Sequence, residues 1–340
     1  MRSRVVAFVA VCAVCLTVAV GYSLTAGRSA RPSSAGRAAA GPVGALDPVA
    51  GTYLGFVGTR IDGTFGRLAL ASTSRPGDAT SLTDLRCKVA HAALGRGVCL
   101  ELGSALVSSN IVIFDKSFKA VHTIPLRGLP SRVRVAPDGK LGAVTVFVSG
   151  HSYAVAGFST STGIVDLASG RVLASLEDFQ VLRNGKPFRA PDFNFWGVTF
   201  GAKKGSFYAT LGTGGETYLV EGYLATRTAT VLRSNVECPS LSPDGTRLVF
   251  KKRVNSGLGP VQWRLHLLDL ATMRETPLAE TRSIDDQVEW LDDTRVAYST
   301  QRPAPSGETD TWVVPADGSG SPSVLVPDAR SPVAVREWPA

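Results

Sequence analysis

The sequence predicts an all-β protein, a six-bladed β-propeller built from four-stranded antiparallel blades. From residue 49 onward, short β-rich runs alternate with turn residues every 8–12 positions. The 35 Gly and 20 Pro residues indicate many turns, and the scarcity of long amphipathic stretches argues against a helical protein. A strand–turn–strand pattern also recurs with a mean period of about 45 residues, which is typical of propeller blades.

Two segments carry the clearest copies of the turn that joins the first two strands of a blade. Residues 133–146 and 239–250 each show apolar alternation, a Pro-Asp-Gly turn and renewed apolar alternation. In such a turn Pro presets φ near −65°, Asp accepts a local backbone hydrogen bond and Gly tolerates a positive φ. The turn residues are Pro137, Asp138 and Gly139 in the first copy, and Pro243, Asp244 and Gly245 in the second. Degenerate copies occupy residues 88–100, 197–210 and 287–298.

A second strand pair follows several of these turns and completes a four-stranded unit. It reads as strand, polar turn and strand at residues 163–173, 265–278 and 312–325. The predicted blades are residues 51–86, 87–130, 131–190, 191–235, 236–283 and 284–328. The third is long, and residues 183–192 are interpreted as a surface insertion within it.

The two ends of the propeller region complement each other. The first unit lacks a strand before its turn, and residues 331–338 form a strand left over after the sixth unit. We therefore predict that this C-terminal strand completes the first blade and closes the ring, which removes its open edge.

The Ala-Pro-Asp-Gly and Ser-Pro-Asp-Gly turns, with the strand pairs that follow them, resemble the WD-like repeats of the TolB-like propeller family. The resemblance covers about residues 49–338, although only the turns at 137–139 and 243–245 match strongly. It implies a six-bladed propeller outside the cytoplasm that binds other envelope proteins. The sequence departs from TolB at its N-terminus, where a linker stands in place of an α/β domain.

The N-terminal segment carries 23 uncharged residues between Arg4 and Arg28. This run is long enough for a membrane-spanning helix, which favours an uncleaved anchor. A cleaved signal peptide remains the alternative, with Ala19-Val20-Gly21 as the cleavage site. We expect an anchor or signal peptide over residues 1–27, a flexible linker over 28–48 and the propeller over 49–340, on the extracytoplasmic side of a membrane or secreted.

Three of the five cysteines lie in the propeller region. Cys87 and Cys99 flank a predicted hairpin turn, so they are candidates for a disulfide, which would suit an oxidising compartment. Two buried free thiols are the alternative, because sequence does not fix the pairing. Cys238 is interpreted as a small core residue, since no histidine or basic residue accompanies it in the sequence.

Charge and motifs assign no catalytic, cofactor-binding or metal-binding residue. Residues 1–48 carry half of the formal charge of +8. The sequence contains no cluster of basic residues interleaved with aromatics, the pattern that would indicate nucleic-acid binding. No Gly-x-Ser-x-Gly motif or phosphate-binding glycine loop occurs, and the four histidines are isolated. These are His91, His122, His151 and His266. The pairs Asp285-Asp286 and Asp292-Asp293 lack the spacing of a calcium loop. The second pair stands where other blade turns have Asp-Gly.

Two classes of function remain. The first is a monomeric, non-enzymatic binding propeller that presents loops and a channel mouth to a protein or cell-wall partner. The second is a lyase or a glycan- or peptide-active hydrolase whose residues converge on the central channel from different blades. Histidine, tyrosine, arginine and acidic side chains clustered at one channel mouth would favour the enzyme, and a merely polar channel would favour the binder.

Overall fold

The computed structural model describes residues 51–73, 80–105, 107–148, 159–255, 259–303 and 306–338, together with Thr17. The predicted anchor and linker therefore lie outside the described residues, apart from Thr17. Within the part that is described, no helix has the length and hydrophobicity that crossing a membrane requires.

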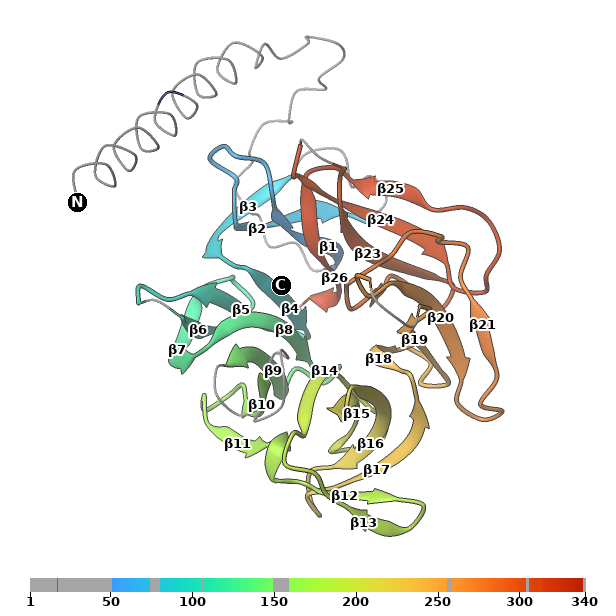
Figure 1. Cartoon of the computed structure of the whole chain (residues 1–340). Helices are drawn as coiled ribbons and strands as arrows, with labels where there is room; N and C mark the ends of the chain where they lie inside the picture. Colours follow the sequence, from blue (N-terminus) through green and yellow to red (C-terminus); the bar gives the residue numbers. More distant parts are fainter. Residues whose placement is uncertain are drawn as a thin grey trace, which may run out of the picture. The chain divides into compact units, whose positions relative to one another are not determined.

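Residues 51–338 form a six-bladed β-propeller, as predicted. Figure 1 shows the six sheets arranged around a common centre. One strand of each sheet contacts the corresponding strands of both neighbouring sheets, so that six inner strands form a ring. The inner strands are β26 (Ala329–Trp338), β4 (Val89–Ala93), β8 (Leu129–Val135), β14 (Asn194–Phe200), β18 (Glu237–Leu241) and β22 (Glu289–Trp290).

In each blade the inner strand is followed outward by three further strands in chain order, with β26 preceding β1 in blade one. Blade one adds β1 (Gly51–Gly58), β2 (Arg67–Ser72) and β3 (Ser81–Arg86), and blade two adds β5 (Arg96–Leu102), β6 (Ser108–Phe114) and β7 (Ala120–Arg127). Blade three adds β9 (Leu141–Val148), β10 (Ser159–Asp166) and β11 (Val172–Ser175), and blade four adds β15 (Ser206–Thr213), β16 (Glu216–Tyr223) and β17 (Thr228–Ser234). Blade five adds β19 (Arg247–Arg253), β20 (Trp263–Asp269) and β21 (Glu275–Pro277), and blade six adds β23 (Arg295–Gln301), β24 (Thr309–Pro315) and β25 (Ser323–Val326).

The five strand–turn–strand segments found in the sequence all join an inner strand to the second strand of its blade. In the first Pro-Asp-Gly turn, the Gly139 amide donates to the Ala136 carbonyl at 2.9 Å, and Asp138 Oδ1 accepts from the Lys140 amide at 3.0 Å. The turn at Pro243, Asp244 and Gly245 makes the equivalent contacts. Both glycines have positive φ, 68° at Gly139 and 73° at Gly245, which explains why glycine occupies this position.

Blade one has no turn between its first two strands, because β26 and β1 come from opposite ends of the propeller. β26 pairs antiparallel with β1, with Val333 opposite Gly55 and Val335 opposite Tyr53, which confirms the predicted ring closure. Trp338 anchors the end of β26 in blade two. Its buried indole stacks on Phe118 with ring centroids 4.9 Å apart, and its Nε1 donates to a backbone carbonyl of the turn between β6 and β7 at 2.8 Å.

The predicted bounds of the third blade were wrong. Its sheet ends at β11, and after a single 3₁₀ turn (Leu176–Asp178) the chain adds two strands to blade four. These are β12 (Gln180–Arg183), which pairs in parallel with β17, and β13 (Lys186–Phe188). Residues 183–192 are therefore not an insertion in blade three, and blade four has six strands instead of four.

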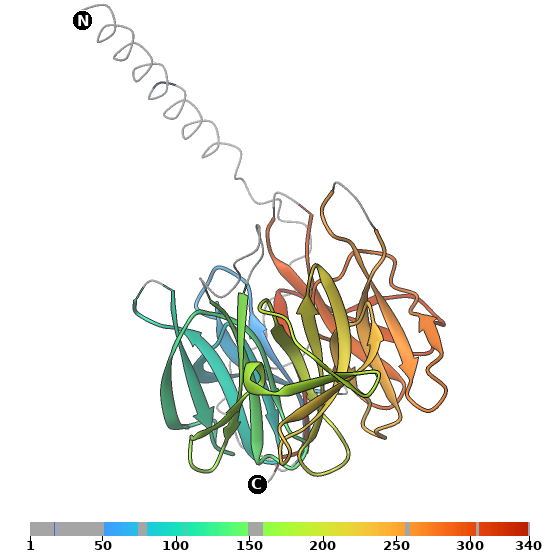
Figure 2. The ribbon, with the colours of Figure 1, turned by 60° about the horizontal axis from the view of Figure 1, so that its bottom comes forward.

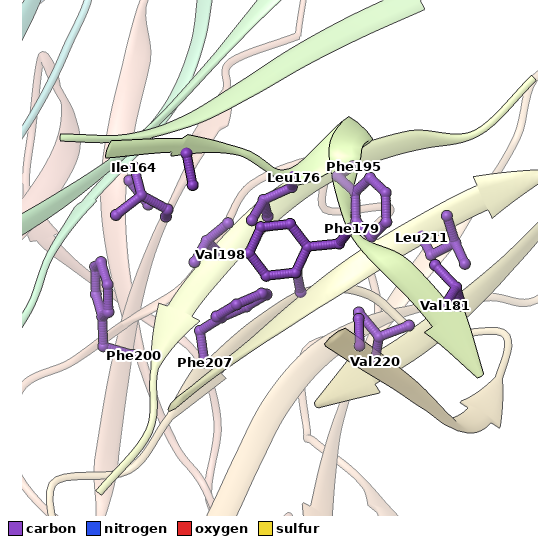
Figure 3. Close-up of a cluster of buried hydrophobic side chains, with 14 of the residues drawn as sticks. Ile164, Leu176, Phe179, Val181, Phe195, Val198, Phe200, Phe207, Leu211 and Val220 are labelled. Atoms are coloured by element: carbon purple, nitrogen blue, oxygen red, sulfur yellow. The ribbon is translucent and has the colours of Figure 1, made fainter. Parts of the chain in front are cut away.

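This segment joins blade four because two apolar side chains that follow the 3₁₀ turn are buried there. Phe179 and Val181 are buried in the core shared by blades three and four. Figure 3 shows Phe179 among these side chains, and its ring meets that of Phe207 edge-on at 5.7 Å. Because the segment buries this pair, it packs along the outer edge of blade four and does not extend into solvent.

The ring has two different faces, since all six inner strands run in the same direction through it. Figure 2 shows the strands of the blades crossing the ring from one face to the other. We call the face where the inner strands begin the start face; Lys88, Ser131 and Arg330 lie there. The opposite face carries the five turns and is called the turn face; Leu94 and Pro137 lie there.

Candidate functional site

A buried ion pair crosses the central channel. Arg134 of β8 donates through Nη1 to Glu289 Oε2 of β22, and through Nη2 to the Val288 carbonyl at 3.0 Å. The Ala334 amide of β26 donates to Glu289 Oε1 at 3.1 Å, and His91 Nε2 of β4 lies 3.3 Å from Glu289 Oε2. We call His91, Arg134 and Glu289 the channel plug. Through it, blades one, two, three and six are joined across the centre.

The hydrogen bonds of the plug fix its protonation. The Val135 amide donates to His91 Nδ1 at 3.1 Å, so this nitrogen carries no proton and Nε2 donates to Glu289. Burial lowers the pKa of His91, in agreement with a neutral imidazole. Burial opposes the charge of Glu289, but His91 and Arg134 outweigh it and lower its pKa to about 2. The plug is therefore a carboxylate paired with a guanidinium and a neutral histidine.

The plug separates two cavities. The turn-face cavity has a volume of about 310 Å³ and mostly apolar walls, including Leu94, Phe200 and Trp290. The start-face cavity has a volume of about 330 Å³, and its walls carry charged and hydroxyl groups. His91 and Arg134 line both cavities, so the plug lies between them. The charged residues of the start-face cavity besides Arg134 are Lys88, Arg132, Asp285, Asp286 and Arg330.

The acidic pair Asp285-Asp286 lies in this start-face cavity, and its two members are in different environments. Asp285 Oδ1 accepts from the buried Lys251 Nζ at 2.5 Å and lies 3.6 Å from Arg132 Nη2. Burial opposes the charge of Asp285, but Lys251 outweighs it and lowers the pKa. Asp286 accepts from the Ser299 amide at 2.8 Å, and burial raises its pKa.

Aspartates of both pairs are engaged within the protein. Among the residues that the structure describes, no group of three or more His, Cys, Asp or Glu side chains is placed to hold a metal ion. Asp292 accepts from the Thr294 amide at 2.8 Å, and Asp293 Oδ1 accepts from the Asp244 amide at 3.1 Å. The second pair therefore stabilises turns, as its sequence position indicated.

The three histidines that the structure describes do not converge. His91 enters the channel, whereas His122 lies on β7 and His266 on β20, strands in the outer half of their blades. His151 lies outside the described residues. Sequence reasoning missed the role of His91, although the signal was present. His91 interrupts the apolar inner strand Val89–Ala93, where a titratable residue must find a buried partner.

Cys238 also has neighbours that its sequence environment does not reveal. It lies at a bulge of β18 with φ of 48°, and its amide donates to Thr210 Oγ1 at 2.8 Å. The electrostatic environments of Lys251 and Arg132 both include its thiol. Cys238 is buried, as expected of a small core residue, and the two cations near it come from other strands.

The two remaining cysteines of the propeller have the geometry of a disulfide. Cys87 precedes β4 and Cys99 lies in β5, and both are buried. Their Sγ atoms are 2.13 Å apart and their Cα atoms 5.3 Å apart, which suits a covalent bond.

Alkylation of the denatured protein, with and without prior reduction, should differ by two modified cysteines. Cys87 and Cys99 react only after reduction, whereas Cys238 reacts in both states. Intact-mass analysis measures the difference whether or not residues 1–27 have been removed, because that segment contributes equally to both samples. Equal alkylation of the two samples would show that both thiols are free.

Comparison with known proteins bears on the fold. No protein-family model and no curated protein matches the sequence. Among solved structures, TolB from Acinetobacter baumannii aligns with a TM-score of 0.60 and 14% identity, over 85% of this chain and 67% of that chain. The chain has a TolB-like six-bladed propeller fold. A chain of a nidogen/laminin complex aligns with a TM-score of 0.53 and 11% identity, over 84% of this chain and 99% of that chain.

The exposed apolar side chains of this TolB-like propeller are distributed unequally between its faces. On the start face they occupy the loops after β1, β5 and β19 and the paired ends of β8 and β9. We call these residues the apolar rim: Ile61, Phe65, Leu102, Val107, Leu129, Phe147, Val254 and Val261. Within the described part of the chain, fewer large exposed apolar side chains lie near the turn face: Leu94 in a turn, and Val121, Val172, Leu173 and Val324 at the turn-face ends of outer strands.

Proposed function

We propose that the chain is a non-catalytic binding propeller that docks a protein partner on its start face. The apolar rim carries this proposal. Ile61 is 92% exposed in the loop after β1, and Leu102 is 62% exposed at the end of β5 in the adjacent blade, on the same face of the ring. Apolar side chains gathered on one face of a soluble domain are typical of an interaction surface, since their burial stabilises a complex.

The channel chemistry supports binding over catalysis. Both ring nitrogens of His91 are engaged, one with the Val135 amide and the other with Glu289. A general base needs a nitrogen that can reach a substrate, so His91 would have to leave the plug to act. Arg134 and Glu289 likewise neutralise each other.

The acidic pair favours an enzyme as the second candidate. Asp285 has a lowered pKa and its neighbour Asp286 a raised pKa, and carboxyl groups with opposite shifts are the arrangement of an acid–base pair. Turnover of a glycan or peptide substrate that is lost in the Asp286→Asn variant would replace the binding proposal.

We further propose that the propeller lies on the extracytoplasmic side of a membrane. The 23 uncharged residues after Arg4 are long enough for an anchor, and the following linker would act as a tether that raises the local concentration of partners. The disulfide geometry of Cys87 and Cys99 is compatible with an oxidising compartment.

Site-specific photo-crosslinking in native cell envelopes tests the docking face. A photoreactive amino acid at Ile61 or Leu102 should give a discrete adduct with the same protein from both positions. The matched control is Leu232 on β17, which is 37% exposed but lies outside the rim. Labelling from Leu232 that matches the rim positions, or no adduct from either rim position, would contradict the proposed docking face.

A further inference from the structure

Two cations of the start-face cavity have no acidic partner. Lys88 lies between β3 and β4, and Arg330 lies near the start of β26. Arg330 Nε donates to the Lys88 carbonyl at 3.2 Å, which brings the two residues side by side. No carboxylate of the described residues lies within ion-pairing distance of either side chain. The cavity thus presents two adjacent positive charges.

The other charges in and behind this cavity are paired within the protein. Arg134 is neutralised by Glu289 of the plug. Arg132 and Lys251 share Asp285. Asp286 accepts backbone hydrogen bonds, and burial raises its pKa, which favours the neutral acid. The positive charge of Lys88 and Arg330 is therefore not offset by the rest of the wall.

Lys88 is exposed and Arg330 is half-buried, so the two cations repel each other in partial contact with solvent. Partial desolvation lowers the pKa of Lys88, and the charge of Arg330 lowers it further. Burial also lowers the pKa of Arg330. On the same wall, the buried Nε of Arg132 has no hydrogen-bond partner. An anion in the cavity would offset the repulsion and accept hydrogen bonds from Lys88 and Arg330.

The rest of the wall is suited to a polyhydroxylated molecule. Ser131, Thr300 and Thr309 contribute hydroxyl groups, and Gln301 contributes an amide. The amide nitrogen of Gln287 already donates to two backbone carbonyls. Phe147 lines the same cavity with 37% of its surface exposed, and so adds an aromatic surface. The volume of about 330 Å³ lies at the lower end of the range for small-molecule sites, about 300–1,000 Å³.

We propose that the start-face cavity binds an acidic sugar, either free or as the terminal residue of an anionic glycan. The carboxylate or phosphate group pairs with Lys88 and Arg330, and the ring hydroxyls bond to the hydroxyl and amide groups of the wall. The sugar ring lies against Phe147. This site goes beyond the proposed docking of a protein, which concerns the rim and does not require a ligand in the cavity.

Calorimetric titration of the full chain tests the site with four probes: glucuronate, glucose 6-phosphate, glucose and inorganic phosphate. At least one acidic sugar should bind at least tenfold more tightly than both glucose and inorganic phosphate. The comparison of glucuronate with glucose 6-phosphate then identifies the anionic group. The double variant Lys88→Ser/Arg330→Ser should bind the preferred sugar at least tenfold more weakly.

The matched control is Lys140→Ser/Arg274→Ser, which removes two exposed cations from turns of the opposite face. It should bind the preferred sugar like the unchanged protein, and thermal unfolding should show that both double variants are folded. The site is overturned if neither acidic sugar is preferred or if both double variants bind equally. An oligoglutamate peptide that binds more tightly than both acidic sugars would also overturn it, because a protein carboxylate would then be the occupant.

Discussion

A chain that lacks residues 330–340 should lose cooperative unfolding. The deletion removes most of β26, the inner strand of blade one, and leaves the edge of β1 unpaired. It also removes the buried side chains of Val333, Val335 and Trp338. Burial of each is worth about 1.5–3 kcal/mol, so their sum is comparable to the about 5–15 kcal/mol that stabilises a typical domain.

Circular dichroism during heating and urea titration measures this effect. The expected result is a broad, non-sigmoidal transition, because a ring without its closing strand leaves the β1 edge unpaired and loses the packing of β26 on blades two and six. A chain that ends at Trp338 is the matched control and should unfold like the full chain. If the deletion variant keeps a sigmoidal transition at the same midpoint, ring closure through β26 does not stabilise the propeller.

The second large effect is expected at the channel plug. Glu289→Gln preserves the shape of the side chain but leaves the Arg134 guanidinium buried without its counter-charge. Removal of one partner from a buried ion pair costs about 3–5 kcal/mol. The shift in pKa gives a similar magnitude, because a fall from 4.5 to about 2 corresponds to about 3 kcal/mol. Urea titration at neutral pH measures the loss in the free energy of unfolding.

A second variant separates the ion pair from a general loss of packing. Arg134→Met combined with Glu289→Gln leaves no unpaired charge in the plug, so it should recover more than half of the stability lost in Glu289→Gln. The single variant Arg134→Met completes the comparison. If the stability lost in the double variant equals the sum of the losses in Arg134→Met and Glu289→Gln, the two charges do not interact as the geometry indicates.

The plug also predicts the direction of an acid effect. The pKa of Glu289 is lower in the folded protein than in the unfolded chain. Its contribution to stability is therefore complete above the unfolded pKa of about 4.3 and is lost as the pH falls towards about 2. The Glu289→Gln variant should lack this part of the acid destabilisation, measured as the free energy of unfolding between pH 5 and pH 2.5.

The sequence by itself determined the architecture, because the features that specify it are local. Strand alternation has a period of two residues, and Pro137-Asp138-Gly139 forms its turn through hydrogen bonds within a few positions. Repetition of these units gave the six blades, and the leftover strand gave the closure with β1. The outer hairpin of blade four escaped the same reasoning, because the parallel pairing of β12 with β17 depends on a distant strand.

Only the tertiary structure decided the chemistry of the channel. His91, Arg134 and Glu289 come from three blades and meet solely because the ring is closed. Lys88 and Arg330 lie 242 positions apart in the chain, yet ring closure brings them side by side. Local sequence patterns record which residues are strand or turn, but the partners of a charged side chain depend on which inner strands face one another across the centre. The candidate site therefore follows from the assembled ring and not from any single blade.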